Sequence, residues 1–158
     1  MFDRQALALV RPMLDVMAAG LQRRGISANQ VSFAGFGFGL VSAIMIAIGS
    51  LDWAVVPLLV NRLCDGLDGT LARLDGPTER GAFLDVTLDF IFYAGVPLAF
   101  AFCDPPRNAL AAAVLLAAFI GTGVTFLAFA IMAEKRGEKS TAYPSKAFYY
   151  LGGLAEGA

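Results

Sequence analysis

The chain has 158 residues, of which 58% are hydrophobic, and its mean hydropathy is +0.67. Soluble domains have about 45–50% apolar residues, so this composition excludes an ordinary soluble protein and indicates an integral membrane protein. The formal net charge is −1 and there is no histidine, so any general base has to be a carboxylate, a lysine or a tyrosine. Two cysteines without a CxxC spacing predict neither a disulfide nor a zinc site.

Residues 1–24 have apolar side chains at intervals of three and four, with arginines off or beside that stripe. The stripe consists of Leu7, Val10, Leu14, Met17 and Leu21. This pattern predicts an amphipathic helix, which is too charged to span a bilayer. We expect it to lie at the membrane interface; the alternative is a packing helix without lipid contact.

Four apolar runs of about 20 residues follow, the length that crosses a bilayer core. We expect membrane spans at about 31–49, 53–74, 79–102 and 109–132. Residues 147–158 look like the start of a fifth span, either truncated or a half-helix. The predicted fold is all-α: a polytopic transmembrane helix bundle with an N-terminal interfacial amphipathic helix, formed by residues 1–158 as a single membrane domain.

Short polar segments and glycines define the helix ends and contacts. Ser27 or Asn29 is expected to cap the first span, and Thr78 to cap the third. Gly35 and Gly39 form a GxxxG pattern, which favours close helix packing. A nucleotide-binding glycine loop is rejected here, because no strand precedes these glycines.

The cationic residues lie almost all on one side of the predicted spans. They are Arg4, Arg11, Arg23 and Arg24 before the first span, Arg73 and Arg80 near the turn after the second, and Lys135, Arg136, Lys139 and Lys146 after the fourth. The other side has only Arg107. By the positive-inside rule, the N-terminus and this turn face the cytoplasm, in the inner membrane if the protein is bacterial.

Four aspartates lie inside the predicted spans. Asp65 and Asp68 are three residues apart on the second span, whereas Gly81, Asp85 and Asp89 follow at four-residue intervals on the third. Residues at these intervals share one helix face, and the short turn makes the two helices antiparallel neighbours. We therefore predict a four-carboxylate site in the cytoplasmic half of the bundle.

Such a site requires cations, because close carboxylates repel one another. Oxygen ligands suit Mg²⁺, Mn²⁺ or Ca²⁺, and paired hard metals commonly hold a diphosphate during substitution at phosphorus. The small residues Gly69, Ala72 and Gly81 leave room for a nucleotide, and Arg62 and Arg73 are candidate phosphate ligands.

Three other functions fit the acids less well. A divalent-cation transporter would use the same carboxylates, but it would not need the accompanying small residues and Arg73. A structural ion-pair cluster is disfavoured because acids outnumber cations. A catalytically inactive scaffold protein is disfavoured because all four acids are present.

The region from Asp65 to Asp89 resembles the signature of the CDP-alcohol phosphotransferases, also called CDP-alcohol phosphatidyltransferases. The motif reads D65-GL-D68-G69-TL-A72-R73, then G81-AFL-D85-VTL-D89. Every fixed position is present. The spacer, Leu74 to Arg80, has seven residues, one fewer than in many members.

The resemblance implies a six-span bundle, usually a homodimer, whose members transfer a phospho-alcohol group from a CDP-linked donor to an acceptor alcohol and release CMP. Asp65, Asp68 and Asp85 match the family's metal ligands, for two Mg²⁺ or Mn²⁺ ions. Asp89 matches its general base and is also assigned to the second metal. The nucleotide-binding positions correspond to Asp65, Asp68, Gly69, Ala72, Arg73 and Gly81.

The resemblance further implies a lipid donor such as CDP-diacylglycerol, a small polar alcohol as acceptor, and a role in phospholipid biosynthesis. We expect no nucleic-acid partner. Weak candidates for binding the acceptor or a lipid phosphate are Arg62, Lys135, Arg136, Lys139 and Lys146. For the cations after the fourth span, the alternative is ordinary loop charge on the cytoplasmic side.

Overall fold

The computed structural model describes residues 2–136, which form five helices and no strand. The helices are α1 (Phe2–Arg23), α2 (Ala28–Ala47), α3 (Leu51–Asp75), α4 (Glu79–Cys103) and α5 (Pro105–Lys135). The expected all-α membrane bundle is confirmed. Residues 147–158, Lys139 and Lys146 lie outside the described residues.

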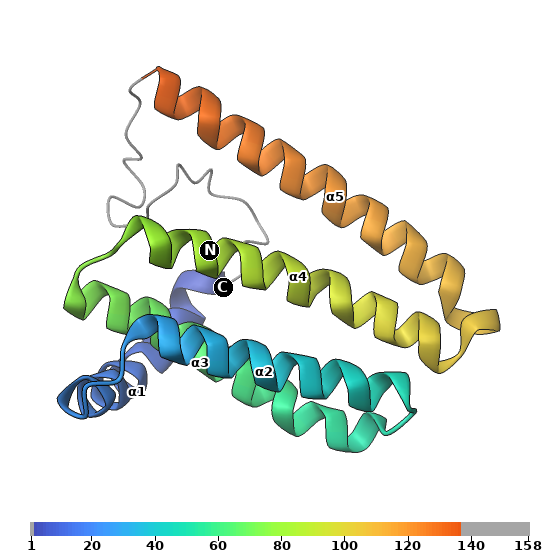
Figure 1. Ribbon diagram of the computed structural model, residues 1–158, viewed down its shortest axis with the longest axis horizontal. Coiled ribbons are helices and arrows are strands. Elements are labelled where there is room, and N and C mark those ends of the chain that lie inside the picture. The colour runs from blue at the N-terminus through green and yellow to red at the C-terminus, as the bar shows by residue number, and fades with distance from the viewer. Residues whose placement is uncertain (1, 137–158) are drawn as a thin grey trace.

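Helices α2 to α5 lie alongside one another with alternating directions, and short turns join them (Figure 1). Helix α2 packs against both α3 and α4, and α5 packs against the other side of α4. Helix α1 runs at an angle to the rest and contacts α3. Helix α2 therefore lies against both α3 and α4, the two helices that carry the four aspartates.

Three helices in the described part are long and apolar enough to cross a membrane: α2, α4 and α5. Helix α3 is 25 residues long, but Arg62, Asp65 and Asp68 make its central part less apolar. The chain is an integral membrane protein. That α3 crosses beside α2, and that residues 1–158 form a single domain, remain predictions.

Polar caps determine where two of these helices begin. Ser27 is the N-cap of α2 and forms a capping box with Gln30, which decides between Ser27 and Asn29. Thr78 caps α4 as expected, because its hydroxyl accepts a hydrogen bond from the amide of Gly81 at 3.0 Å. Helix α5 begins at Pro105, ahead of the expected start of the fourth span at about residue 109. Proline suits a first helical turn because its missing N–H has no helical partner there.

The predicted contact through Gly35 and Gly39 is present. A Cβ atom on Gly35 would lie 2.7 Å from Cβ of Cys64, and one on Gly39 would lie 2.7 Å from the Phe92 ring. Such distances leave no room for a side chain. The two glycines therefore let α2 approach α3 and α4 closely, next to the aspartates.

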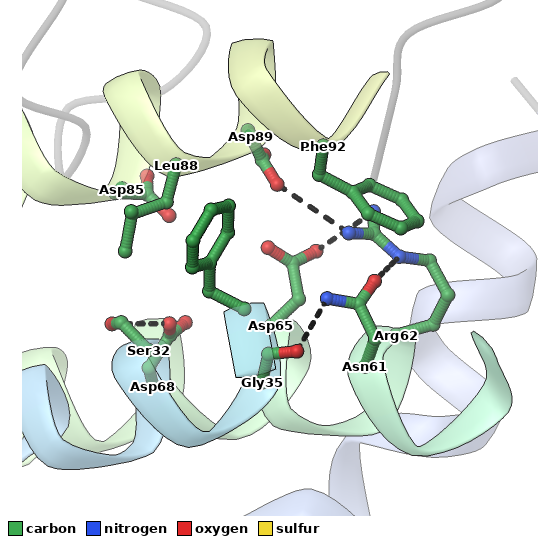
Figure 2. Close-up of a pocket in the computed structure, with 11 residues that line it drawn as sticks. Ser32, Gly35, Asn61, Arg62, Asp65, Asp68, Asp85, Leu88, Asp89 and Phe92 are labelled. Carbon is green, nitrogen blue, oxygen red and sulfur yellow. Dashed lines mark hydrogen bonds and ion pairs between the residues drawn. The ribbon is translucent and has the colours of Figure 1, made fainter. Parts of the chain in front are cut away.

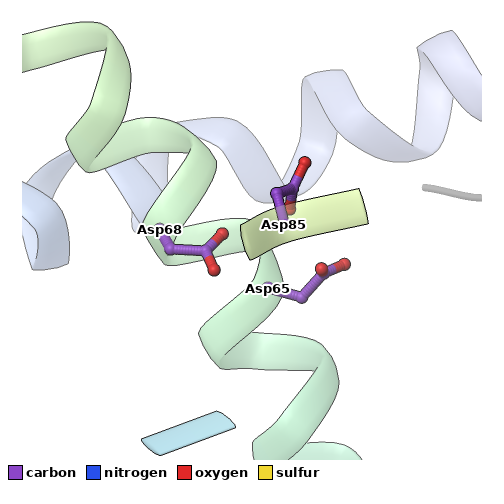
Figure 3. Close-up of side chains that lie close together, drawn as sticks. All are labelled: Asp65, Asp68 and Asp85. Atoms are coloured by element: carbon purple, nitrogen blue, oxygen red, sulfur yellow. The ribbon is translucent and has the colours of Figure 1, made fainter. Parts of the chain in front are cut away.

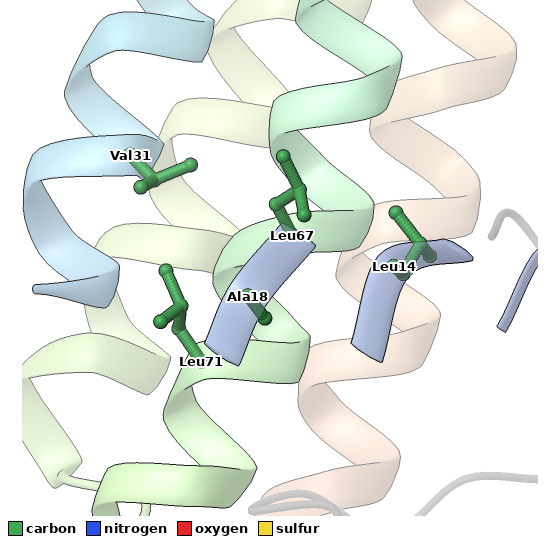
Figure 4. Close-up of a cluster of buried hydrophobic side chains, with 5 residues drawn as sticks. All are labelled: Leu14, Ala18, Val31, Leu67 and Leu71. Carbon is green, nitrogen blue, oxygen red and sulfur yellow. The ribbon is translucent and has the colours of Figure 1, made fainter. Parts of the chain in front are cut away.

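One face of α1 packs into the protein. Leu14 and Ala18 are buried against Val31, Leu67 and Leu71, as Figure 4 shows. Other apolar side chains of α1 are exposed, namely Val10, Met13, Val16 and Met17. The helix thus packs against α3 and still offers an apolar surface; its place at the membrane interface remains a prediction.

Candidate active site

The antiparallel arrangement of α3 and α4 brings three of the four aspartates together (Figure 3). Asp65, Asp68 and Asp85 each offer one carboxylate oxygen, and these three oxygens lie within 4.8 Å of one another. Asp68 is buried, Asp65 is half-buried and Asp85 is exposed. The cluster is therefore open on the Asp85 side and closed on the Asp68 side.

Asp68 is held by a residue from a third helix. The Ser32 hydroxyl on α2 donates a 2.5 Å hydrogen bond to Oδ2 of Asp68. The other oxygen, Oδ1, is buried and has no hydrogen-bond partner among the described residues. A buried carboxylate oxygen without a partner costs free energy unless a cation or proton compensates it, so the residues present fit a hard divalent metal ion.

Asp89, the fourth acid, lies on the same side of α4 and pairs with Arg62 of α3 (Figure 2). The Arg62 Nη2 atom is 3.4 Å from Oδ1 of Asp89, and its Nη1 atom is 3.5 Å from Oδ2 of Asp65. One arginine therefore partly compensates two of the four acids.

The four aspartates and Arg62 border a cavity of about 20 Å³. This volume is close to what a single water occupies, so the cavity is far too small for a nucleotide. A nucleotide would have to bind over the open side of the cluster, beyond Asp85.

Comparison with known proteins identifies the family. The family model described as CDP-alcohol phosphatidyltransferase matches residues 26–154. The chain belongs to this family. The family that the motif predicted is therefore confirmed. The protein is a membrane phosphotransferase that uses a CDP-alcohol donor and an alcohol acceptor.

Individual relatives agree with this family. The chain is 46% identical to the inner membrane protein YnjF of Escherichia coli (strain K12) over 157 residues, which is 99% of this chain and 76% of that protein. It is 35% identical over 92 residues to a phosphatidylinositol phosphate synthase of Streptomyces avermitilis, covering 56% of this chain and 37% of that protein. It is 32% identical over 88 residues to an archaetidylinositol phosphate synthase of Pyrococcus horikoshii, covering 55% and 47%. No solved structure matches the chain.

The motif's other residues lie around the acids without lining the small cavity. Gly69 and Ala72 are half-buried on α3, and a Cβ on Gly69 would be 3.7 Å from the nearest Arg73 nitrogen. The Arg73 side chain donates a 2.8 Å hydrogen bond to the hydroxyl of Thr70. Gly81 lies in the first turn of α4, beside Asn29 of α2. In this member of the family, these residues flank the acids on the side of the α3–α4 turn.

The weak phosphate candidates divide into three groups. Arg62 lies in the acid cluster, where carboxylates already pair with it. Lys135 and Arg136 are exposed at the end of α5, at the end of the bundle where α4 begins, and do not line the cavity. Lys139 and Lys146 lie outside the described residues. A role for any of them at the site remains a prediction.

Residues that contact Asp68 or Arg62 were missed in the sequence, namely Ser32, Asn61, Phe92 and Tyr93. Asn61 lies four residues before Asp65, and Tyr93 lies four after Asp89, so extending the helical periodicity by one turn on each helix would have found both. Ser32 has no comparable signal, because its partner is 36 positions away on another helix.

Proposed function

We propose that this phosphatidyltransferase moves a phosphatidyl group from CDP-diacylglycerol to a small polar alcohol and releases CMP. The observation that carries the proposal is the meeting of Asp65, Asp68 and Asp85 between helices of the bundle, with Oδ1 of Asp68 lacking a hydrogen-bond partner among the described residues. Because apolar helices surround the acids, a lipid donor would reach them sideways from the bilayer.

The acceptor we propose is an inositol phosphate. Two relatives are named phosphatidylinositol phosphate synthase and archaetidylinositol phosphate synthase. Their similarity covers about half of this chain, so the acceptor needs a direct test. Cations at the end of the bundle where α4 begins, including Lys135 and Arg136, could bind the phosphate of such an acceptor.

For the metal we propose Mg²⁺ or Mn²⁺, held by Asp65, Asp68 and Asp85. When bound, the metal would neutralise the donor diphosphate and stabilise negative charge on the departing phosphate. Two ions are expected, with Asp89 sharing the second. Charge supports this number: four carboxylates and Arg62 sum to −3, and two divalent ions bring the site to +1, which favours an anionic diphosphate.

The chain's own residues would position and deprotonate the acceptor. Asp89 takes the proton from the acceptor hydroxyl as that oxygen attacks the β-phosphorus. The bond between this phosphorus and the oxygen bridging to the CMP phosphate breaks, and CMP leaves with that oxygen. Gly69, Ala72 and Gly81 would leave space for the cytidine nucleotide, and Arg73 would lie near the diphosphate.

Further features of the proposal concern the membrane. The N-terminus and the α3–α4 turn would face the cytoplasm, where a phosphorylated acceptor and the CMP product are soluble. The protein would act as a homodimer. Membership in a family of phosphotransferases favours this function over the divalent-cation transporter considered from the sequence.

The test is a CMP-release assay with the purified full chain, CDP-diacylglycerol and four acceptors: inositol phosphate, inositol, glycerol 3-phosphate and serine. We expect release with inositol phosphate, loss of release on chelation, and recovery with Mg²⁺ or Mn²⁺. Release that survives exhaustive chelation would refute the metal proposal. Release with another acceptor alone would refute the acceptor proposal and leave the transferase reaction intact.

A further inference from the structure

We propose that Arg62 is a positioning residue for Asp89, and that it fixes the carboxylate that accepts the proton from the acceptor alcohol. The inference rests on the function proposed above. Arg62 is not part of the aspartate motif, but its guanidinium joins the two acid-bearing helices. Nη2 pairs with Asp89 on α4 at 3.4 Å, and Nη1 pairs with Asp65 on α3 at 3.5 Å.

The guanidinium is itself fixed from several sides (Figure 2). Its Nε atom donates a 2.9 Å hydrogen bond to Oδ1 of Asn61, and Nη1 donates one of 2.9 Å to the Tyr93 hydroxyl. The charge also lies 4.7 Å from the centroid of the Phe92 ring, a cation–π distance. Asn61 in turn donates to the backbone oxygen of Gly35 on α2, at 2.9 Å.

These contacts form one connected path from α2 through α3 to α4. Three helices thereby determine where the guanidinium lies, and the guanidinium determines where the Asp89 carboxylate lies. Asn61 and Phe92 are buried, so their side chains have little freedom to release Arg62. A rigidly held partner of this kind is what a proton acceptor needs, because small errors in position reduce rate strongly.

The same contacts argue against phosphate binding as the main role of Arg62. Each of its three side-chain nitrogens already has a partner in the protein: Asn61 for Nε, Tyr93 and Asp65 for Nη1, and Asp89 for Nη2. A phosphate ligand would have to displace at least one of them. Positioning and phosphate binding make different predictions, since the first acts on kcat and the second on the KM for the donor.

The experiment compares Arg62→Met, Arg62→Lys and Tyr93→Phe with the unchanged full chain, in CMP release and in Mn²⁺ binding. Arg107→Met is the matched control, because Arg107 also pairs with an aspartate three residues away, Asp104, at 3.8 Å, but on an exposed surface at the other end of the bundle. Each kcat is expressed per folded protein, so that a variant that folds poorly does not count as a slow one.

We expect Arg62→Met to lower kcat about 100-fold, a typical effect of misplacing a reacting group, with the KM for CDP-diacylglycerol nearly unchanged. Arg62→Lys should recover only part of this loss, because an ammonium cannot reproduce the planar fork of a guanidinium. Tyr93→Phe, which keeps the ring and removes one hydrogen bond to Arg62, should lower kcat about fivefold. Arg107→Met should behave like the unchanged chain.

Mn²⁺ binding gives a readout that does not depend on turnover. Removing a positive charge beside Asp65 and Asp89 should tighten Mn²⁺ binding about fivefold in Arg62→Met, with no change in Arg107→Met. An unchanged kcat in Arg62→Met and Tyr93→Phe, or a large rise in donor KM with kcat retained, would overturn the inference. If the unchanged chain neither binds Mn²⁺ nor releases CMP, the proposed function itself fails, which is a distinguishable result.

Discussion

The Ser32 hydroxyl on α2 donates a 2.5 Å hydrogen bond to one oxygen of Asp68 on α3, while the other oxygen of Asp68 is buried without a hydrogen-bond partner in the described part of the chain. This pair gives the carboxylate a fixed orientation. Residues that orient a metal ligand typically contribute 10–100-fold to metal affinity. Ser32 is therefore expected to influence metal affinity through its hydrogen bond to Asp68.

Replacing Ser32 by alanine should weaken Mn²⁺ binding about tenfold and raise the Mn²⁺ concentration needed for half-maximal CMP release. Ser42→Ala is the control, because Ser42 lies on the same helix, is fully buried and donates a 2.9 Å hydrogen bond to the backbone oxygen of Ala54. It should cost about 1 kcal/mol of stability without changing metal affinity. Equal metal affinities in the two variants would contradict this role of Ser32.

The proposed base gives a second prediction. Asp89→Asn keeps the size and shape of the side chain but cannot accept the proton from the acceptor hydroxyl. It should lower kcat by about 10²–10⁴-fold, while a CDP-lipid still binds, as measured by equilibrium binding of a radiolabelled donor. Turnover near that of the unchanged chain would refute the assignment of Asp89 as the base.

Helix packing next to the site gives a third prediction. A Cβ on Gly39 would lie 2.7 Å from the Phe92 ring and 3.1 Å from Nδ2 of Asn61, whereas a Cβ on Gly37 would have no neighbour within 4 Å. Gly39→Ala should therefore destabilise the bundle by about 1–3 kcal/mol, measured by thermal unfolding in detergent. Gly37→Ala, on the same helix, should change stability little. Equal stability of the two variants would show that α2 does not approach α4 in this way.

The acids could be predicted from the sequence because each is a polar residue in an apolar helix, where helical spacing alone determines which face it occupies. Asp65 and Asp85 could be assigned to one site from that spacing and from the short turn between their helices. Close helix packing at Gly35 was also predictable, since small residues at an interval of four favour it, but its partner Cys64 was not.

The contacts that hold the acids in place were not predictable in the same way. The hydrogen bond between Ser32 and Asp68 depends on the rotation of α2 about its axis, which is set by packing through Gly35 and Gly39. For Arg62, the sequence indicated a phosphate ligand, because a cation near a diphosphate site is usually assigned that role. Two of its partners, Asp89 and Tyr93, lie on another helix, and helical spacing places them on the site face without showing that they reach the guanidinium.

The proposed nucleotide-binding residues give the last prediction, and it separates ligand binding from folding. A Cβ on Gly69 would be 3.7 Å from a nitrogen of Arg73, an ordinary van der Waals distance, so Gly69→Ala should fold normally. If the cytidine nucleotide packs against Gly69, the added methyl group should raise the KM for CDP-diacylglycerol about tenfold, which corresponds to about 1.4 kcal/mol of lost binding. Gly95→Ala is the control, because Gly95 lies on α4 beyond the acids and a Cβ there would have no neighbour within 4 Å. An unchanged KM in Gly69→Ala, measured together with an unchanged unfolding temperature, would place the nucleotide elsewhere.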